Sequence, residues 1–399
     1  MFKVGRGHAL KTAVGASATA AIAGALILSL GLSAGNASAL ATGAHRASAR
    51  RANLVTLGQL DNSTGSTSPS APSAEGVVDV QPAVTHLSGG TVKTTYQLPD
   101  GQALTSTTPP VGFDPLVASD AALQEYGFPE RPTDPSALAD WTTAMDAYTS
   151  DSPPSEPLQI ATSITASLEY APQYGWNWGG YIAGTQQTQS HWFVALKDAF
   201  SLPSTGGKCL PQNYNDLGFW IGLGGTLAGA NTLVQQGVVC GNSDVGSGSS
   251  WRPFIEFANT TGPFAFCGYS AWTPADGSEI YENMSYQTSS NEANFYLENE
   301  TTGVAHSCSL GAPNGWSFDG NTAEWIGEAP AGQAAKFGSV TFTDANAELG
   351  SSGSWVTLGS RTLTEVAAGY SASNYCIVPG DVGSDAQSFT DSWGSGTCP

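Results

Sequence analysis

Two short runs place polar side chains that could take part in catalysis inside segments that otherwise look like buried strands. Residues 234–237 read VQQG and contain the amide Gln235, whereas residues 323–328 read AEWIGE and contain the carboxylates Glu324 and Glu328. A carboxylate can act as a general base, and an amide can donate a hydrogen bond to a developing oxyanion. With only five histidines in the chain, this pair indicates acid hydrolysis by a carboxylate and an amide.

Strand geometry makes a prediction about which of these side chains share a face. Residues four apart in a strand point the same way, so Glu324 and Glu328 should lie on one face and Trp325 on the other. A carboxylate is costly to bury while ionised, so each one either points to solvent or has a chemical purpose. Of the adjacent amides Gln235 and Gln236, one must face inward. The pattern leaves a second interpretation open, in which the two glutamates form a polar outer face and the glutamine is a hydrogen-bonded amide in the core.

Several other hydrolytic chemistries are excluded by what the sequence lacks. Its single Gly-x-Ser-x-Gly run, residues 31–35, lies in an apolar N-terminal stretch without a strand-turn-helix setting. Only His191 and His306 follow residue 164, so a serine triad is disfavoured. There is no CxxC pair, which disfavours a zinc site, and we expect neither a metal nor a cofactor. Glu256, within the apolar run 253–257, is a further carboxylate to consider.

Composition and charge favour an acidic all-β protein. Charged residues make up 12% of the chain and glycines number 48, which favours many short strands and tight turns. The net charge of −20 disfavours nucleic acid and anionic membranes as partners. After residue 164 the chain has only five lysines and arginines, so it cannot become strongly positive in acid. The composition therefore permits function at low pH, and it also fits a generic acidic secreted protein.

The N-terminus is typical of an export signal. A basic start is followed by an apolar stretch at residues 12–32 and by the small-residue cleavage site at residues 37–39. A membrane anchor is the alternative, although the stretch is rich in glycine and alanine. An even number of cysteines in an exported chain predicts disulfides, with the pairing left open. The six cysteines are Cys209, Cys240, Cys267, Cys308, Cys376 and Cys398.

The remaining chain divides into an N-terminal region and a strand-rich region. Residues 40 to about 115 look poorly ordered, and residues 118–149 show helix-like spacings that predict two short helices, the second starting near residues 134–136. A proline-containing linker follows. From about residue 165, alternating runs such as 339–343 and 354–358 predict strands separated by glycine-rich turns. The pattern favours one β-sandwich or barrel over 165–399.

Six runs occur in a fixed order along this region: Asn177 to Gly180, Trp220 to Gly225, Val234 to Gly237, Phe254 to Phe257, Leu297 to Gly303 and Ala323 to Glu328. In type and order they resemble the motifs of the glutamic peptidase (eqolisin) family of secreted, acid-acting endopeptidases. The resemblance extends from about Asn177 to the C-terminus. Each motif alone is weak, but six in the right order are specific.

The resemblance implies a fold, an activity and a set of site residues. The fold would be a concanavalin-like β-sandwich of two large antiparallel sheets, preceded by a partly disordered, partly helical pro-region. Gln235 and Glu328 fall on the positions of the catalytic dyad. Trp178, Trp220 and Glu256 fall on positions that line or support the substrate cleft. Three positions depart from the family pattern: Gly224 and Arg252 each replace an Asp, and Ala258 replaces a Tyr.

These inferences define an expected organisation. Residues 1–39 would be a signal peptide, 40–164 a propeptide and linker with short helices at 118–149, and 165–399 the catalytic domain. The protein would be a secreted monomer that cleaves polypeptides, without nucleic-acid partners or stable membrane association. The alternatives are a glycosidase, with Glu324 and Glu328 as its paired carboxylates, and a non-catalytic carbohydrate- or surface-binding β-sandwich.

Overall fold

The structure, a computed structural model, describes most of the chain after residue 76. The described residues are 77–99, 101–133, 135–149, 152–161, 177–184, 193–207, 209, 215–225, 232–241, 248–258, 264–330, 333–350, 353–361, 363–366, 368–369 and 375–394. The chain divides into one unit of residues 1–51 and a second of residues 52–399, and every described residue belongs to the second. The predicted signal peptide therefore lies outside the described residues.

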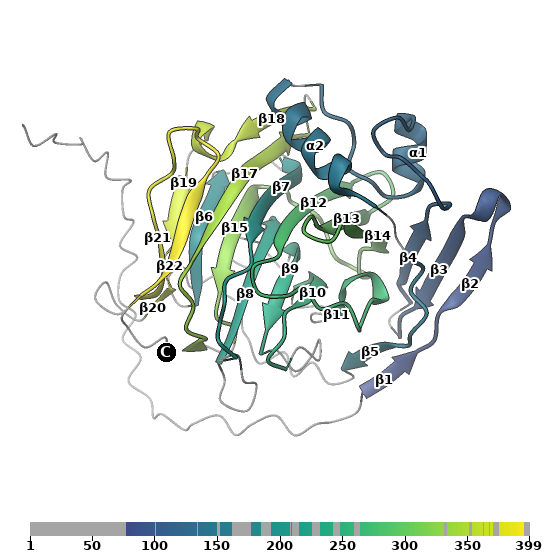
Figure 1. The fold of residues 1–399 in the computed structure, drawn as a ribbon, viewed down its shortest axis with the longest axis horizontal. Helices are drawn as coiled ribbons and strands as arrows, with labels where there is room; N and C mark the ends of the chain where they lie inside the picture. Colours follow the sequence, from purple (N-terminus) through teal and green to yellow (C-terminus); the bar gives the residue numbers. More distant parts are fainter. Residues whose placement is uncertain are drawn as a thin grey trace, which may run out of the picture. The chain divides into compact units, whose positions relative to one another are not determined.

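Two large sheets form the framework, as predicted (Figure 1). The eight-stranded sheet runs in the order β11 (Phe264–Ala265), β10 (Arg252–Phe257), β9 (Val234–Cys240), β8 (Asn215–Leu223), β15 (Thr322–Glu328), β6 (Trp178–Gly184) and β19 (Leu363–Val366). These neighbours pair antiparallel, while β16 (Gln333–Ala334) pairs parallel with β8.

The second sheet has twelve strands, and its neighbours pair antiparallel. Its order is β2 (Ala83–His86), β3 (Val92–Gln97), β4 (Ala103–Thr108), β14 (Val304–Gly311), β13 (Glu292–Asn299), β12 (Glu279–Gln287), β7 (Phe193–Ser201), β17 (Ser339–Leu349), β22 (Phe389–Trp393), β21 (Tyr375–Pro379) and β20 (Ala368–Gly369), with β18 (Ser354–Thr357) beside β17. A separate ribbon joins β1 (Val77–Val80) to β5 (Leu158–Ala161). The 3₁₀ turns are η1 (Ser88–Gly90), η3 (Phe266–Gly268) and η4 (Leu358–Ser360).

The main hydrophobic core lies between the two sheets. Phe200 and Phe342 of the twelve-stranded sheet meet Phe219 of the eight-stranded sheet, with ring centroids 6.0 and 6.1 Å from Phe219. Trp325 of β15 is fully buried in the same core. Apolar burial of this kind is the main favourable term in folding. The sandwich prediction is confirmed, and so is the prediction that Trp325 faces away from Glu324 and Glu328.

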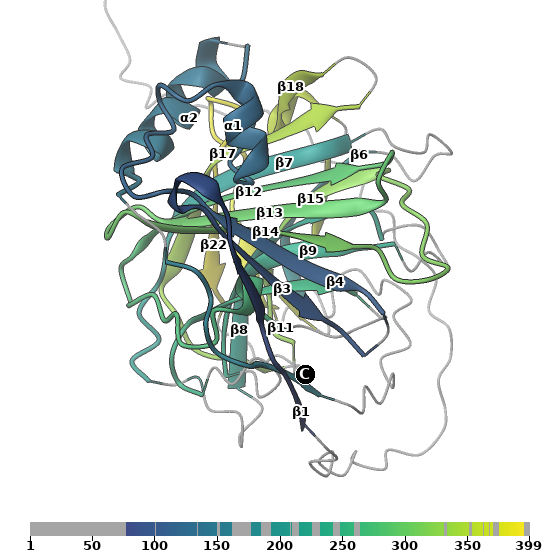
Figure 2. The ribbon, with the colours of Figure 1, turned by 90° about the vertical axis from the view of Figure 1, so that its right-hand side faces the viewer.

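Two helices form where the sequence predicts them. Helix α1 (Asp120–Glu125) is capped by Ser119, whose side chain accepts a hydrogen bond from the Ala122 N–H at 3.2 Å. Helix α2 (Pro135–Ala147) begins at a proline, which suits a first helical turn. Both helices pack on the outer face of the twelve-stranded sheet, on the side away from the eight-stranded sheet (Figure 2).

The expectation of little ordered structure from residue 40 to about 115 is wrong for its second half. Residues 77–108 form β1 to β4, and β4 pairs with β14 in the large sheet. The segment is rich in threonine, whose β-branched side chain favours strands. Two of its large apolar side chains, Tyr96 and Leu104, are fully buried, whereas others such as Val84 and Leu87 are exposed. A strand of this kind looks like a polar low-complexity run when only its composition is considered.

Disulfides join the cysteines whose pairing the sequence left open. Cys209 pairs with Cys240, and Cys267 pairs with Cys308. Cys376 is buried, and Cys398 lies outside the described residues. No described cysteine is free. The disulfide prediction is therefore confirmed for four of the six cysteines.

Acidic side chains are buried at several places in the sandwich. Asp198 and Glu282 face each other across β7 and β12, and both are fully buried. Burial raises the pKa of each well above its usual range, and their mutual repulsion adds to the effect on Glu282. Burial also raises the pKa of Asp391 to about 8, against a hydrogen bond from the Gly327 backbone. Burial raises the pKa of Glu298 to about 8 as well.

We predict that the protein is more stable in acid than at neutral pH. A carboxyl with a raised pKa binds its proton more tightly in the folded chain, so its contribution is complete below its ordinary pKa of about 4 and is lost as pH rises toward 8. The free energy of unfolding, measured with urea at pH 4, 6 and 8, should fall across this range. Asp391→Asn should reduce the fall, whereas Asp146→Asn, a substitution at an exposed position of α2, should not. Equal or greater wild-type stability at pH 8 would contradict this prediction.

Candidate active site

Five neighbouring strands bring the predicted site residues onto one face of the eight-stranded sheet. Trp178, Trp220, Gln235, Glu256 and Glu328 come from β6, β8, β9, β10 and β15 respectively. Their strand neighbours, among them Tyr181, Phe219, Val234, Ile255 and Trp325, belong to the core between the sheets. Because side chains alternate along a strand, the five site residues point away from that core. They share this outer face with a smaller apolar cluster that includes Trp178 and Trp220.

Glu328 is held by two nitrogen donors. Asn177 donates its Nδ2–H to Oε1 at 2.9 Å, and Trp220 donates its indole N–H to Oε2 at 2.8 Å. Hydrogen bonds to a carboxylate are among the stronger ones in proteins and favour its charged form. Glu328 also lies opposite Trp178 in the strand register. The sequence marked Asn177 only as the start of the first motif and gave it no role, although its position before Trp178 was an available signal.

Gln235 is fixed by the neighbouring strand. It lies opposite Glu256, and its Nε2 donates to Glu256 Oε2 at 2.6 Å. An amide nitrogen carries two protons, so one N–H remains for another acceptor. Gln236 is the inward-facing amide and donates to the Tyr296 backbone oxygen at 2.9 Å. Gln236 is thus the satisfied core amide, and Gln235 is the amide on the outer face.

Trp220 lies between the two polar groups. In the register, Gln235 pairs with Gly222 and Glu328 pairs with Gly218, so Trp220 is midway along β8 on the same face. Its ring packs edge-on against Trp178, with centroids 4.9 Å apart. Gln235 and Glu328 thus flank one indole.

Two glycines make room for Trp220. A Cβ on Gly222 would lie 2.8 Å from the Trp220 ring. A Cβ on Gly237, the residue opposite Trp220, would lie 2.4 Å from Trp220 Cβ and 2.3 Å from the Phe219 oxygen. Real Cβ contacts are not that short, so both positions require glycine while Trp220 keeps its place.

Glu324 shares the face of Glu328, as predicted, but its environment differs. It is fully buried, whereas Glu328 keeps 9% of its surface exposed. Burial raises the pKa of Glu324 well above its usual range, against a hydrogen bond from Thr322 at 3.0 Å. Glu324 therefore holds its proton to higher pH than an ordinary glutamic acid, and water has better access to Glu328. This contrast favours Glu328 as a base.

The three departures from the family pattern change the surroundings of the site. Gly224 has φ of +79°, and a Cβ there would lie 2.6 Å from Asp319 Oδ1, so the Asp319 carboxylate occupies that space. Asp319 also accepts a hydrogen bond from Thr232 at 2.7 Å. Arg252 lies on the face of Glu256, four residues away, and adds a cation there. Ala258 packs against the outer apolar cluster.

A comparison with known protein families shows which family this chain belongs to. The profile described as "Peptidase A4 family" matches residues 176–381, which is more than half of the chain. The chain belongs to the peptidase A4 family. It is a glutamic peptidase, a hydrolase that acts on polypeptides, as the six motifs predict. The matched residues contain all five predicted site residues.

Solved structures similar to this A4 peptidase include two glutamic peptidases. Scytalido-glutamic peptidase with a transition-state analogue is 20% identical, with a TM-score of 0.42 over 55% of this chain and 100% of its own. Aspergilloglutamic peptidase from Aspergillus niger is 22% identical, with a TM-score of 0.36 over 45% of this chain and 99% of its own. A search of curated proteins gave no significant match. Among the described residues, no helix has the length and apolarity needed to cross a membrane.

We predict that Trp220→Phe weakens the peptidase without unfolding it. The ring is kept and the hydrogen bond to Glu328 is lost. Loss of a hydrogen bond to a charged group costs about 1.5–3 kcal/mol, so the turnover rate should fall roughly 10- to 100-fold. The acid limb of the pH–rate profile should move to higher pH, because the carboxylate loses a donor.

Trp316→Phe is the matched control for this change. Trp316 lies in the main core, and its indole nitrogen has no hydrogen-bond partner among the described residues. Its substitution should leave the pH profile unchanged. Identical profiles for the two variants would contradict a role of Trp220 in holding Glu328.

Proposed function

We propose that the protein is a secreted, acid-acting endopeptidase in which Gln235 and Glu328 form the catalytic dyad. The observation that carries the proposal is the shared outer face. There Glu328 is held by Asn177 and Trp220, while Gln235 is oriented by Glu256. Membership of the peptidase A4 family supports the reaction class.

Glu328 acts first as general base in this mechanism. It takes a proton from a water molecule whose oxygen attacks the scissile carbonyl carbon, which gives a tetrahedral intermediate with a negative oxygen. When the C–N bond breaks, the protonated Glu328 gives its proton to the leaving nitrogen. The products are a carboxylic acid and an amine, and Glu328 is again a carboxylate.

Gln235 stabilises the charge that develops on the carbonyl oxygen. Its Nε2 has one N–H committed to Glu256, and the second donates to the oxyanion. Because Glu256 fixes the amide before the substrate binds, little reorganisation is needed in the transition state. Trp178 and Trp220 offer an apolar floor for the peptide beside the dyad.

Acid action and secretion are supported by separate observations. The net charge of −20 and the buried carboxyls, whose pKa values are raised by burial, suit a protein that is stable in acid. The export signal and the disulfides suit passage through an oxidising compartment. In this proposal residues 1–39 are a signal peptide, residues 165–399 form the catalytic domain, and residues 40–164 are a pro-region whose cleavage from that domain does not by itself imply release.

We expect Gln235→Ala and Glu328→Gln to abolish acid proteolysis while the fold is kept. Loss of an oxyanion donor should slow cleavage roughly 10²- to 10³-fold, and loss of the base by up to about 10⁴-fold. The measurement is digestion of denatured casein or haemoglobin between about pH 2 and pH 7, with an aspartic-peptidase inhibitor present throughout.

Glu324→Gln is the matched control, because it makes the same substitution in the same strand at a fully buried carboxyl whose pKa is raised by burial. It should keep most of the activity. Activity that survives Glu328→Gln would instead assign the base to Glu324 or Glu256. No cleavage by correctly processed wild type would favour a non-catalytic binding protein.

A further inference from the structure

The segment before the catalytic domain is built into the sandwich. We call residues 77–161, as far as they are described, the N-terminal clamp. Its strand β4 pairs with β14 through Leu104 opposite Leu310 and Thr105 opposite Ser309. The pairing continues the twelve-stranded sheet outward through β3 and β2. Removal of the clamp would leave β14 as an exposed edge strand, which invites pairing with other chains.

The clamp also supplies part of the main core. Tyr96, Leu98, Leu104 and Leu158 are buried in the same apolar cluster as the side chains between the two sheets. Tyr96 packs directly on Gly268, where a Cβ would lie 2.5 Å from its ring. A catalytic domain without the clamp would therefore expose apolar core surface to water.

The helices of the clamp cover the outer face of the twelve-stranded sheet. Leu123, Trp141 and Met145 are fully buried against Tyr281 and Tyr296. These contacts form an apolar cluster separate from the main core. Without the helices, Tyr281 and Tyr296 would form part of an exposed apolar patch on this sheet face. Large patches of this kind are rare on monomeric proteins and mark interaction surfaces.

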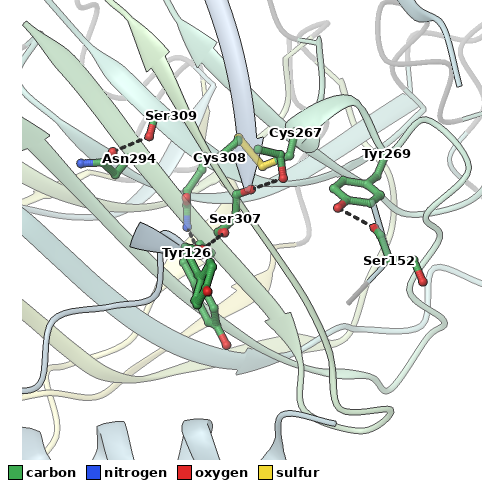
Figure 3. Close-up of a disulfide and its surroundings, with 11 residues drawn as sticks. Tyr126, Ser152, Cys267, Tyr269, Asn294, Ser307, Cys308 and Ser309 are labelled. Carbon is green, nitrogen blue, oxygen red and sulfur yellow. Dashed lines mark hydrogen bonds between the residues drawn. A yellow bond between two sulfur atoms is a disulfide. The ribbon is translucent and has the colours of Figure 1, made fainter. Parts of the chain in front are cut away.

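Hydrogen bonds hold the clamp next to the disulfide between Cys267 and Cys308 (Figure 3). Ser307 donates to the Tyr126 backbone oxygen at 2.5 Å, and Tyr269 donates to the Ser152 backbone oxygen at 2.7 Å. Ser307 adjoins Cys308, and Tyr269 follows Cys267 by two residues, so each half of the disulfide lies next to one of these bonds. They anchor the clamp at two points that are 26 residues apart in its own sequence.

An ion pair adds to this interface. Lys197 of β7 is only 1% exposed, and its Nζ lies 3.3 Å from Asp140 Oδ2 of helix α2. Loss of the clamp would remove the carboxylate that pairs with this lysine, and breaking a buried pair by removing one partner is unfavourable.

The clamp helices lie on a different face from the candidate site. They pack on the outer face of the twelve-stranded sheet, whereas Gln235 and Glu328 lie on the outer face of the eight-stranded sheet (Figures 1 and 2). Retention of these helices therefore does not block a peptide from reaching the dyad.

We propose that the N-terminal clamp is a permanent part of the working enzyme, so that a cut between residues 161 and 177 gives two chains that stay bound. The partner of the apolar outer face is thus a segment of the same protein rather than a second protein. All six cysteines follow residue 208, so no disulfide joins the clamp to the rest of the chain. The association after a cut must be non-covalent. The inference rests on packing and is independent of the proposed dyad.

The test cuts the full chain at one chosen place. The recognition sequence of a site-specific endopeptidase is inserted between Thr165 and Ala166 of the Glu328→Gln variant, and the purified protein is cleaved. The two fragments should elute together in size-exclusion chromatography at the volume of the uncut protein. They should separate on a denaturing gel without reductant.

Interface variants sharpen the test. Leu123→Ala with Trp141→Ala should release the clamp fragment after the cut, and Asp140→Asn should weaken its retention about tenfold. Val111→Ala is the matched control, because Val111 is a fully exposed clamp residue, and it should leave retention unchanged. Asp140→Asn keeps the test informative where the double variant does not fold.

Release of the unmodified clamp under native conditions, with residues 166–399 still folded and soluble, would overturn the inference. So would a chain of residues 166–399, expressed alone, that unfolds at the same urea concentration as the full protein. The same insertion in a chain that keeps Glu328 separates this question from the proposed function. Fragments that elute together but lack proteolytic activity would contradict the proposed function and leave the association of the two fragments intact.

Discussion

Side chains alternate between the two faces of a strand, and the structure of this protein depends on that constraint. In β8, β9, β10 and β15 one set of side chains fills the space between the sheets, and the other set forms the candidate site. The same packing that buries Trp325 therefore fixes the direction of Glu328. Because the core positions the site, a site side chain in these strands cannot move to the other face of the sheet without displacing a core residue. This rigidity suits chemistry that needs groups oriented in advance.

Within that frame, Trp220 links the parts of the site. Its indole donates to Glu328, packs on Trp178 and lies between Glu328 and Gln235 along β8. Gly222 and Gly237 leave the space that this ring needs. A residue expected only to line a cleft thus also orients the proposed base. The short glycine-containing motifs of the sequence have a physical explanation here, because they leave room for a large ring on a crowded sheet.

The sequence predicted the sandwich, the two helices and the shared face of Glu324 and Glu328 because each depends on local periodicity. Strand periodicity alone could not choose between Gln235 and Gln236, or between Glu324 and Glu328, because burial depends on strands that are distant in sequence. Only the resemblance of the motifs selected Gln235 and Glu328. The role of Asn177 also required the register of β6 against β15. The strands at 77–108 were missed because their threonine-rich composition resembles a polar linker. Likewise, the approach of Asp319 to Gly224 arises from residues 95 positions apart.

The claim that Gln235 and Glu328 act as one unit can be measured most directly with a double-mutant cycle. Single-turnover peptide hydrolysis would be compared for wild type, Gln235→Ala, Glu328→Gln and the double variant at the wild-type optimum. Groups that act on the same transition state are strongly non-additive, so the double variant should be little slower than Glu328→Gln alone. Losses that multiply, as they do for independent sites, would contradict a joint role of the two residues.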